Sequence, residues 1–154
     1  MPDFEAMPLP AMLHTVFISM NLSAQTFRKE ERLCSKKVMM NLFGSGEVFF
    51  TPLFKVVWCL NQIETEFPAQ VAFSVLKKNY RRAVDRNLIK RRMREAYRKN
   101  KYSLYEKLDS LDISIAFIII FRGAEITSCS NIEKHMKEML AKLSEAVTRN
   151  HQNC

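Results

Sequence analysis

The sequence predicts an α+β fold, a small sandwich in which helices pack on a sheet. Short runs rich in β-branched and aromatic residues alternate with stretches whose apolar residues recur every three or four positions. The 154 residues suffice for one domain with a substantial core. Hydrophobic residues make up 47% of the chain and include eleven phenylalanines, which is typical of a folded protein. The predicted order is helix, three strands, basic helix, strand, helix.

The first predicted helix covers residues 36–43. Ser35 can cap its N-terminus, and Gly44 is expected to end it. Its apolar residues fall on one face, which can bind a sheet: they are Val38, Met39, Leu42 and Phe43.

Strands are predicted in the next segment. Residues 48–60 are rich in aromatic and β-branched side chains, and Pro52 divides them into a short strand and a longer one from about Leu53. Residues 61–68 are polar and turn-like, and residues 71–76 form the third predicted strand.

The second half of the chain predicts a helix, a strand and a helix. A basic helix begins near Ala83 and buries one apolar stripe, made of Ile89, Met93, Ala96 and Tyr97. Residues 112–121 are the clearest buried strand. Ser130 and Glu133 predict a capping box. It opens a closing helix with a periodic stripe of Ile132, Met136, Met139, Leu140, Leu143 and Val147.

Positive charge is concentrated in residues 77–101. This stretch holds twelve basic and two acidic residues, whereas the rest of the chain is slightly acidic, so the net charge of +8 originates here. A solvated helical face is the alternative interpretation, but a run of nearly one sign repels itself unless a partner is present. The pattern therefore predicts binding to RNA or DNA, because neutralised phosphates release counterions.

Other sequence features exclude several classes. The four cysteines (Cys34, Cys59, Cys129 and Cys154) form no C-x-x-C pair, which predicts neither a structural zinc site nor a disulfide framework. The longest apolar run, residues 113–121, falls well short of the roughly 20 residues of a membrane span.

Residues 1–22 are expected to be a disordered extension, with Met20 as a possible true start. Residues 23–149 are the expected domain and 150–154 a tail.

Residues 73–98, FSVLKKNYRRAVDRNLIKRRMREAYR, resemble the signature of the bacterial ribonuclease P protein component. In that family a strand ends in two lysines, and a short basic link leads to a helix with an Arg-Asn-Arg triplet. Residues 27–46 resemble the family's N-terminal block, and the resemblance covers roughly residues 25–143. One position departs, since Leu88 stands where the triplet usually has its second arginine. Arg92 is a candidate to restore that charge from another helical angle.

The resemblance implies a role in tRNA maturation. The family assists a catalytic RNA that removes the 5′ leader of precursor tRNA by magnesium-dependent hydrolysis, and the RNA holds the active site. The implied protein is cytoplasmic, its partners are the catalytic RNA and precursor tRNA, and neither a membrane nor DNA is an expected partner. Mg²⁺ would act mainly through the RNA. The family also implies a left-handed strand–helix–strand crossover, an exception to the right-handed rule.

Two sets of contacts follow from the resemblance. The basic link and helix would dock on the catalytic RNA, where arginine forks and lysine charges suit phosphate oxygens. Asn87 has two interpretations, an RNA contact or a cap of the local backbone. The candidates are Lys77, Lys78, Arg81, Arg82, Arg86, Asn87, Lys90, Arg91, Arg94 and Arg98.

A cleft between the first helix and the sheet would hold the single-stranded leader, which needs apolar platforms and cations. Core packing is favoured for Met39 and is an equal alternative for Phe43 and Val57. Lys55 differs, because a lysine inside an apolar strand must reach water or a phosphate. The candidates are Arg32, Lys36, Lys37, Phe43, Lys55 and Val57.

Three other functions have weaker support in the sequence. A self-contained nuclease would need its own acid–base or metal constellation, yet His14, His135 and His151 are scattered and have no nearby carboxylate cluster. A non-enzymatic RNA-binding module, such as a ribosomal protein, would share the basic charge. A DNA-binding basic helix would normally be followed by dimerising heptads, which are absent after Arg98.

Overall fold

The structure is a computed structural model that describes residues 26–61 and 66–153. The expectations for residues 1–22, including the alternative start at Met20, lie outside the described residues, as do His14 and Cys154.

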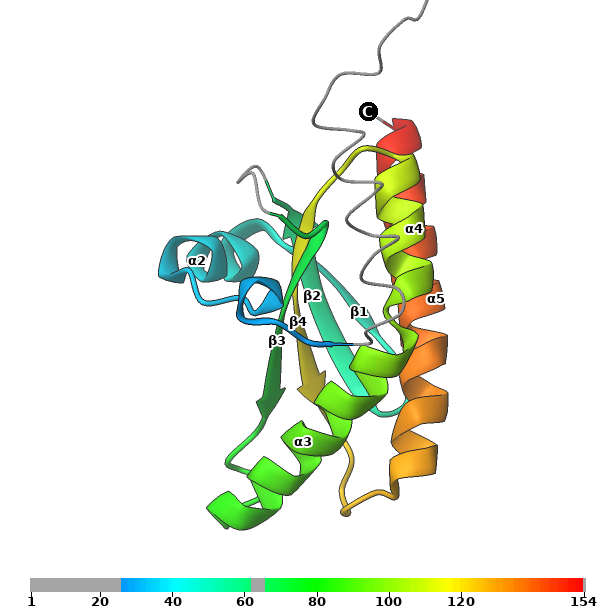
Figure 1. Cartoon of the computed structure of the whole chain (residues 1–154). Coiled ribbons are helices and arrows are strands. Elements are labelled where there is room, and N and C mark those ends of the chain that lie inside the picture. The colour runs from blue at the N-terminus through cyan, green and yellow to red at the C-terminus, as the bar shows by residue number, and fades with distance from the viewer. Residues whose placement is uncertain (1–25, 62–65, 154) are drawn as a thin grey trace, which may run out of the picture.

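Four strands form one mixed sheet in the order β1–β2–β4–β3 (Figure 1). They are β1 (Glu47–Phe50), β2 (Phe54–Leu60), β3 (Ala69–Val75) and β4 (Ile115–Phe121). β1 and β2 form an antiparallel hairpin, and β2 also pairs antiparallel with β4. β3 pairs parallel with β4, so the chain between them crosses over one face of the sheet. The predicted α+β class is confirmed.

The helices divide between the two faces of the sheet. α2 (Lys36–Ser45) lies on one face, whereas α3 (Ala83–Asn100), α4 (Tyr102–Ser110) and α5 (Cys129–Asn153) lie on the other (Figure 1). A short 3₁₀ turn, η1 (Lys29–Glu31), precedes α2.

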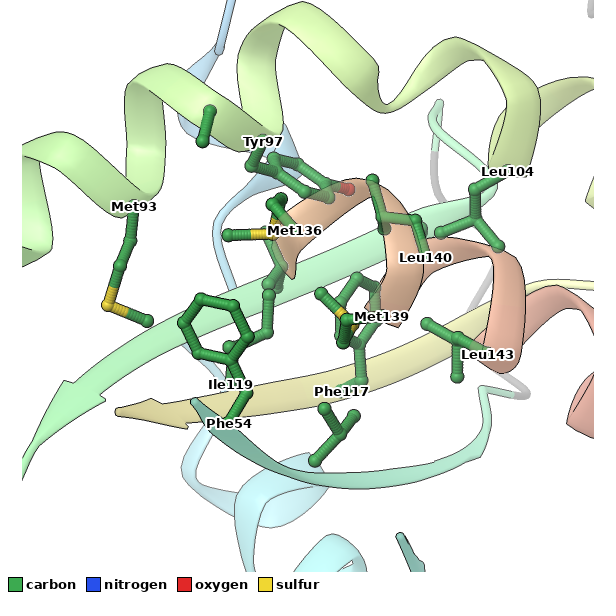
Figure 2. Packing of buried hydrophobic residues seen from close by; sticks show 14 of the residues in the cluster. Phe54, Met93, Tyr97, Leu104, Phe117, Ile119, Met136, Met139, Leu140 and Leu143 are labelled. Atoms are coloured by element: carbon green, nitrogen blue, oxygen red, sulfur yellow. The ribbon is translucent and has the colours of Figure 1, made fainter. Parts of the chain in front are cut away.

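The larger core lies between the sheet and α3–α5. Figure 2 shows Tyr97 of α3 beside Met136 of α5, and Met139 of α5 beside Phe117 of β4, all in one buried cluster. All members of the two predicted helical stripes are buried in this core, which confirms the faces of both helices. A smaller core under α2 contains Val38, Leu42, Val57, Ala116 and Ile118, together with Leu33.

Some predicted element ends were wrong. Gly44 lies inside α2, and Gly46 caps the helix with φ of −70°. A Cβ at Gly46 would clash with the backbone oxygen of Leu42 and would lie 2.9 Å from Cγ1 of Val57, so glycine is needed there by the end of α2 itself and by its close approach to β2. At the start of β4, Asp112 has φ of 52°, a left-handed conformation that a strand cannot contain, and β4 begins only at Ile115.

The closing helix begins before its predicted cap. It begins at Cys129, and the hydroxyl of Ser128 accepts a hydrogen bond from the Asn131 N–H at 3.4 Å, so Ser130 lies within the first turn and is not the cap. The helix continues through Asn153.

Candidate nucleic-acid interface

The ten cationic and polar candidates of the first set lie on one basic surface, formed by α3 and the link before it (residues 76–82). The apolar stripe of α3 fixes its orientation, since Ile89, Met93 and Tyr97 are fully buried. The other faces of α3 therefore point to solvent. None of the ten candidates is buried: Arg86, Lys90 and Arg98 are half-buried and the other seven are exposed.

Arg86 organises the link. Its Nη1 donates to the backbone oxygens of Tyr80 at 2.8 Å and Arg81 at 2.7 Å. Tyr80 is buried, and its hydroxyl donates to the Gly123 carbonyl at 2.8 Å. Burial raises the pKa of Tyr80, and the charges of Glu125 and Asp85 act in the same direction. Arg86 therefore holds the backbone that presents the neighbouring cations, in addition to carrying a charge of its own.

Two other side chains of α3 have distinct environments. Asn87 is exposed and makes no side-chain hydrogen bond within the described part of the chain, which argues against a role as a local cap. Arg92 is half-buried, and its Nη1 donates to the Thr127 carbonyl at 2.6 Å. Arg92 thus ties α3 to the β4–α5 loop, and the structure gives no support to the hypothesis that it replaces the cation missing at Leu88.

Arg98 is partly neutralised by its own helix. Its Nε and Nη2 donate to the two carboxylate oxygens of Glu95 at 3.0 and 2.5 Å. The hydrogen bond from Arg98 lowers the pKa of Glu95, although this carboxylate is well exposed. Of the ten candidates, Arg98 is the one whose charge is already compensated within the described residues.

The opposite face of the sheet carries part of the second set. Phe43 is 65% exposed at the end of α2, and Lys55 projects half-buried from the same side of β2. Val57, however, is 4% exposed and belongs to the small core under α2. Met39 is half-buried and packs against the same core. The packing interpretation therefore accounts for Val57 and Met39, while Phe43 and Lys55 remain available to a ligand.

Two residues that the sequence did not single out extend this face. Phe50 pairs with Lys55 across the β1–β2 hairpin and is 52% exposed. The Nζ atom of Lys55 lies 5.8 Å from the centre of the Phe50 ring, and Cζ of Arg122 lies 4.9 Å from it. An aromatic ring beside two cations suits a single-stranded nucleic acid. We call the surface formed by Phe43, Lys55, Phe50 and Arg122 the leader face, after the ligand that the sequence resemblance leads us to expect there.

The remaining candidates of the second set are dispersed. Lys36 and Lys37 are exposed in the first turn of α2. Lys37 lines a polar hollow of about 560 Å³ between α2 and the end of β2, which does not include Lys55 or Phe43. Arg32 lies elsewhere, in a hollow that it shares with Arg94 of α3. The structure therefore does not bring Arg32 and Lys37 together with the leader face.

The described residues contain no group of three or more His, Cys, Asp or Glu side chains placed to hold a metal ion. His135 lies on α5, 3.4 Å from Glu138, on a helix remote from the leader face. None of the described helices is long and apolar enough to span a membrane.

Comparison with known proteins gives a consistent result. A family model described as Ribonuclease P matches residues 27–144. The ribonuclease P protein component of Porphyromonas gingivalis (strain ATCC 33277) is 34% identical over 118 residues, which cover 75% of this chain and 85% of that protein. The component of Chlorobium phaeobacteroides is 37% identical over 91 residues, covering 57% and 62%.

Solved structures have the same fold. The RNase P protein of Staphylococcus aureus superposes with a TM-score of 0.56 at 25% identity, over 74% of this chain and 94% of that one. The RNase P protein from Thermotoga maritima gives a TM-score of 0.57 at 20% identity, over 73% and 96%. This second likeness supports the fold alone.

Proposed function

Because this chain belongs to the ribonuclease P protein family and is the protein subunit of that endoribonuclease, we propose that it binds two RNAs on two surfaces. Family membership implies the ribonuclease P RNA as its partner. The basic surface of α3 and its link would dock on this catalytic RNA. The leader face would hold the 5′ leader of precursor tRNA, so that the leader is removed by magnesium-dependent cleavage.

The observation that carries this proposal is the orientation of α3. Burial of Ile89, Met93 and Tyr97 leaves the cations of α3 on its outer faces, and its two acidic residues, Asp85 and Glu95, cannot balance them. Such a surface is costly to assemble without a polyanion and is stabilised when phosphates release their counterions to it. An extended, structured RNA matches the length of the surface better than a small anion does.

The leader face has the composition that a single strand requires. Phe43 and Phe50 offer exposed rings on which bases can stack, and Lys55 and Arg122 offer cations to the phosphates between them. None of these features reads a particular base edge. The proposed contact therefore tolerates leaders of different sequence.

We assign the chemical step to the RNA. In this proposal the contribution of the chain is to bind and orient the RNAs and to neutralise their phosphates with its exposed cations. Mg²⁺ would be held by the RNA and would supply the chemistry of metal-assisted hydrolysis there, and we propose no residue of this chain as its ligand. By the same family argument, the proposed location of the protein is the cytoplasm.

Lys55→Ala tests the assignment of the leader face. The affinity of the reconstituted enzyme should fall for leader-bearing precursor tRNA and stay unchanged for mature tRNA. Lys107→Ala, which removes an exposed lysine of α4 on the other face of the sheet, is the matched control and should change neither. Equal losses for the two RNAs would remove Lys55 from the leader face.

A further inference from the structure

Arg32 and Arg94 line one hollow at the edge of the sheet. β3 lies at the edge of the sheet. Apart from β4, its only backbone partner in the described residues is the segment just before α2. The Leu33 N–H donates to the Val71 carbonyl at 3.0 Å, and the chain then leaves β3 to enter α2. The hollow lies beside this contact and has a volume of about 300 Å³. It is lined by Phe27, Arg32, Leu33, Cys34, Val71, Ala72, Phe73 and Arg94.

The side chain of Arg32 is held in place before any ligand arrives. Its Cζ lies 5.6 Å from the centre of the Phe27 ring, an arrangement in which the guanidinium keeps its N–H groups free to donate. Phe27 in turn makes edge-to-face contacts with Phe73 at 5.9 Å and Tyr97 at 5.8 Å. Tyr97 is fully buried, so the platform under Arg32 is anchored in the main core.

The backbone at Arg32 is fixed as well. The adjacent residue, Glu31, is fully buried and forms an ion pair with Lys101. Its carboxylate also accepts hydrogen bonds from the Tyr105 hydroxyl at 2.6 Å and the Arg28 N–H at 2.6 Å. The hollow is therefore preorganised, which reduces the entropy lost on binding.

The charges of the hollow are uncompensated. Within the described part of the chain, neither Arg32 nor Arg94 forms an ion pair, whereas Glu31 is paired with Lys101 and Glu95 with Arg98. Two guanidinium groups at one half-enclosed site favour an oxyanion with several acceptor oxygens. The volume is at the lower end of the range for small-ligand pockets, roughly 300–1,000 Å³. It suits a single nucleotide.

We propose that this hollow is a single-nucleotide site for the catalytic RNA, in which Arg32 and Arg94 hold one phosphate together. The sugar or base of that nucleotide would lie against Phe27 and Phe73. The inference rests on the proposed docking of α3 on the catalytic RNA, because Arg94 belongs to that surface. It also reassigns Arg32, which the sequence placed beside the leader, to the interface with the catalytic RNA.

Salt dependence can count the phosphates involved. Binding of the full-length protein to the catalytic RNA is measured across a salt series for wild type, Arg32→Gln, Arg94→Gln and the double variant. Each single change should lower affinity roughly tenfold. If the two arginines share one phosphate, the double variant loses about one unit of slope in total. A loss of about two units, or of none, would overturn the shared site.

Two control variants separate the loss of a shared phosphate contact from the loss of two independent contacts and from the loss of side-chain geometry. Arg81→Gln combined with Arg91→Gln, on the link and in the middle of α3, should lose about two units. Arg32→Lys keeps the charge but not the fork or its position over Phe27, so affinity should fall while the slope stays near wild type. Thermal melting verifies that each variant is folded.

Two further outcomes of these binding measurements would also contradict the nucleotide site. If wild-type protein binds the catalytic RNA no better than an unrelated RNA of equal length, the proposed function fails and the nucleotide site with it. If wild type binds specifically but the Arg32 and Arg94 variants weaken only the binding of leader-bearing precursor tRNA, the proposed function stands and the occupant of the hollow is the leader, which contradicts the inference.

Discussion

Glu31 and Lys101 form a buried ion pair that ties the segment before α2 to the junction of α3 and α4. Glu31 is fully buried and Lys101 is 3% exposed. The Nζ atom of Lys101 also donates to the Thr26 carbonyl, and the Tyr105 hydroxyl donates to the Glu31 carboxylate. Burial lowers the pKa of Lys101, while the hydrogen bond and charge of Glu31 oppose this shift. The pair thereby holds the segment that carries Arg32 against the end of α3.

We expect Lys101→Met to lower the free energy of unfolding by about 3–5 kcal/mol, because it leaves the carboxylate of Glu31 buried without its cation. Urea denaturation measures the change. Lys137→Gln is the matched control, since it breaks an exposed pair with Glu133 and should cost less than about 1 kcal/mol. Equal effects of the two substitutions would show that the Glu31–Lys101 pair is solvated in solution.

Alkaline pH should destabilise the fold through two tyrosines. Burial raises the pKa of Tyr97, and burial together with the charges of Tyr97 and Glu31 raises the pKa of Tyr105 well above its usual value. Above about pH 10 the unfolded chain releases these protons and the folded protein keeps them, so stability falls as pH rises. Absorbance of tyrosinate at 295 nm should show both residues titrating only as the protein unfolds. Early titration of all four tyrosines would contradict this.

Substitutions that conserve charge should separate Arg86 from Arg91. Lysine cannot reproduce the two hydrogen bonds by which Arg86 holds the carbonyls of Tyr80 and Arg81, so Arg86→Lys should weaken binding to the catalytic RNA by disordering the link. The Arg91 side chain is exposed and makes no hydrogen bond within the described residues, so Arg91→Lys should be nearly neutral. Filter binding compares the two, and similar affinities would show that the link needs no such support.

Phe50 should contribute to binding of the leader by stacking. Phe50→Ala is expected to cost roughly 1–3 kcal/mol of affinity for leader-bearing precursor tRNA. Phe50→Trp should retain most of that affinity. Leu60→Ala is the control, because Leu60 is similarly exposed (51%). It lies at the end of β2 that is far from Lys55, the cross-strand partner of Phe50. Should Phe50→Ala and Leu60→Ala behave alike, the leader face would have to be redrawn without Phe50.

Local patterns accounted for much of the fold. The apolar stripes of α3 and α5 were predicted correctly, because a period of three to four residues marks the buried face of a helix directly in the sequence. α4 was missed, although Leu104, Tyr105 and Leu108 are buried at helical spacing. It follows α3 after the single residue Lys101, without a capping side chain, so no stop or start signal marks the boundary.

The site was less predictable, because its geometry depends on contacts between distant segments. Arg32 lies shortly before α2 in the sequence. The buried ion pair of Glu31 nevertheless directs this segment toward α3. The contact between Phe50 and Arg122 follows from the register in which β1 and β4 both flank β2, and neither strand reveals it alone. The one sequence signal for Arg122 was its position, because it is an arginine that directly follows a predicted apolar strand.

The central claim is that this chain supports cleavage by RNA without cutting RNA itself. Its most direct test is the cleavage of precursor tRNA by the cognate catalytic RNA over a Mg²⁺ series, with and without the purified full-length protein. The protein alone should cleave nothing, and its addition should shift leader removal to lower Mg²⁺, because its cations neutralise phosphates that Mg²⁺ would otherwise screen. The same rate and the same Mg²⁺ dependence with and without the protein would contradict the account.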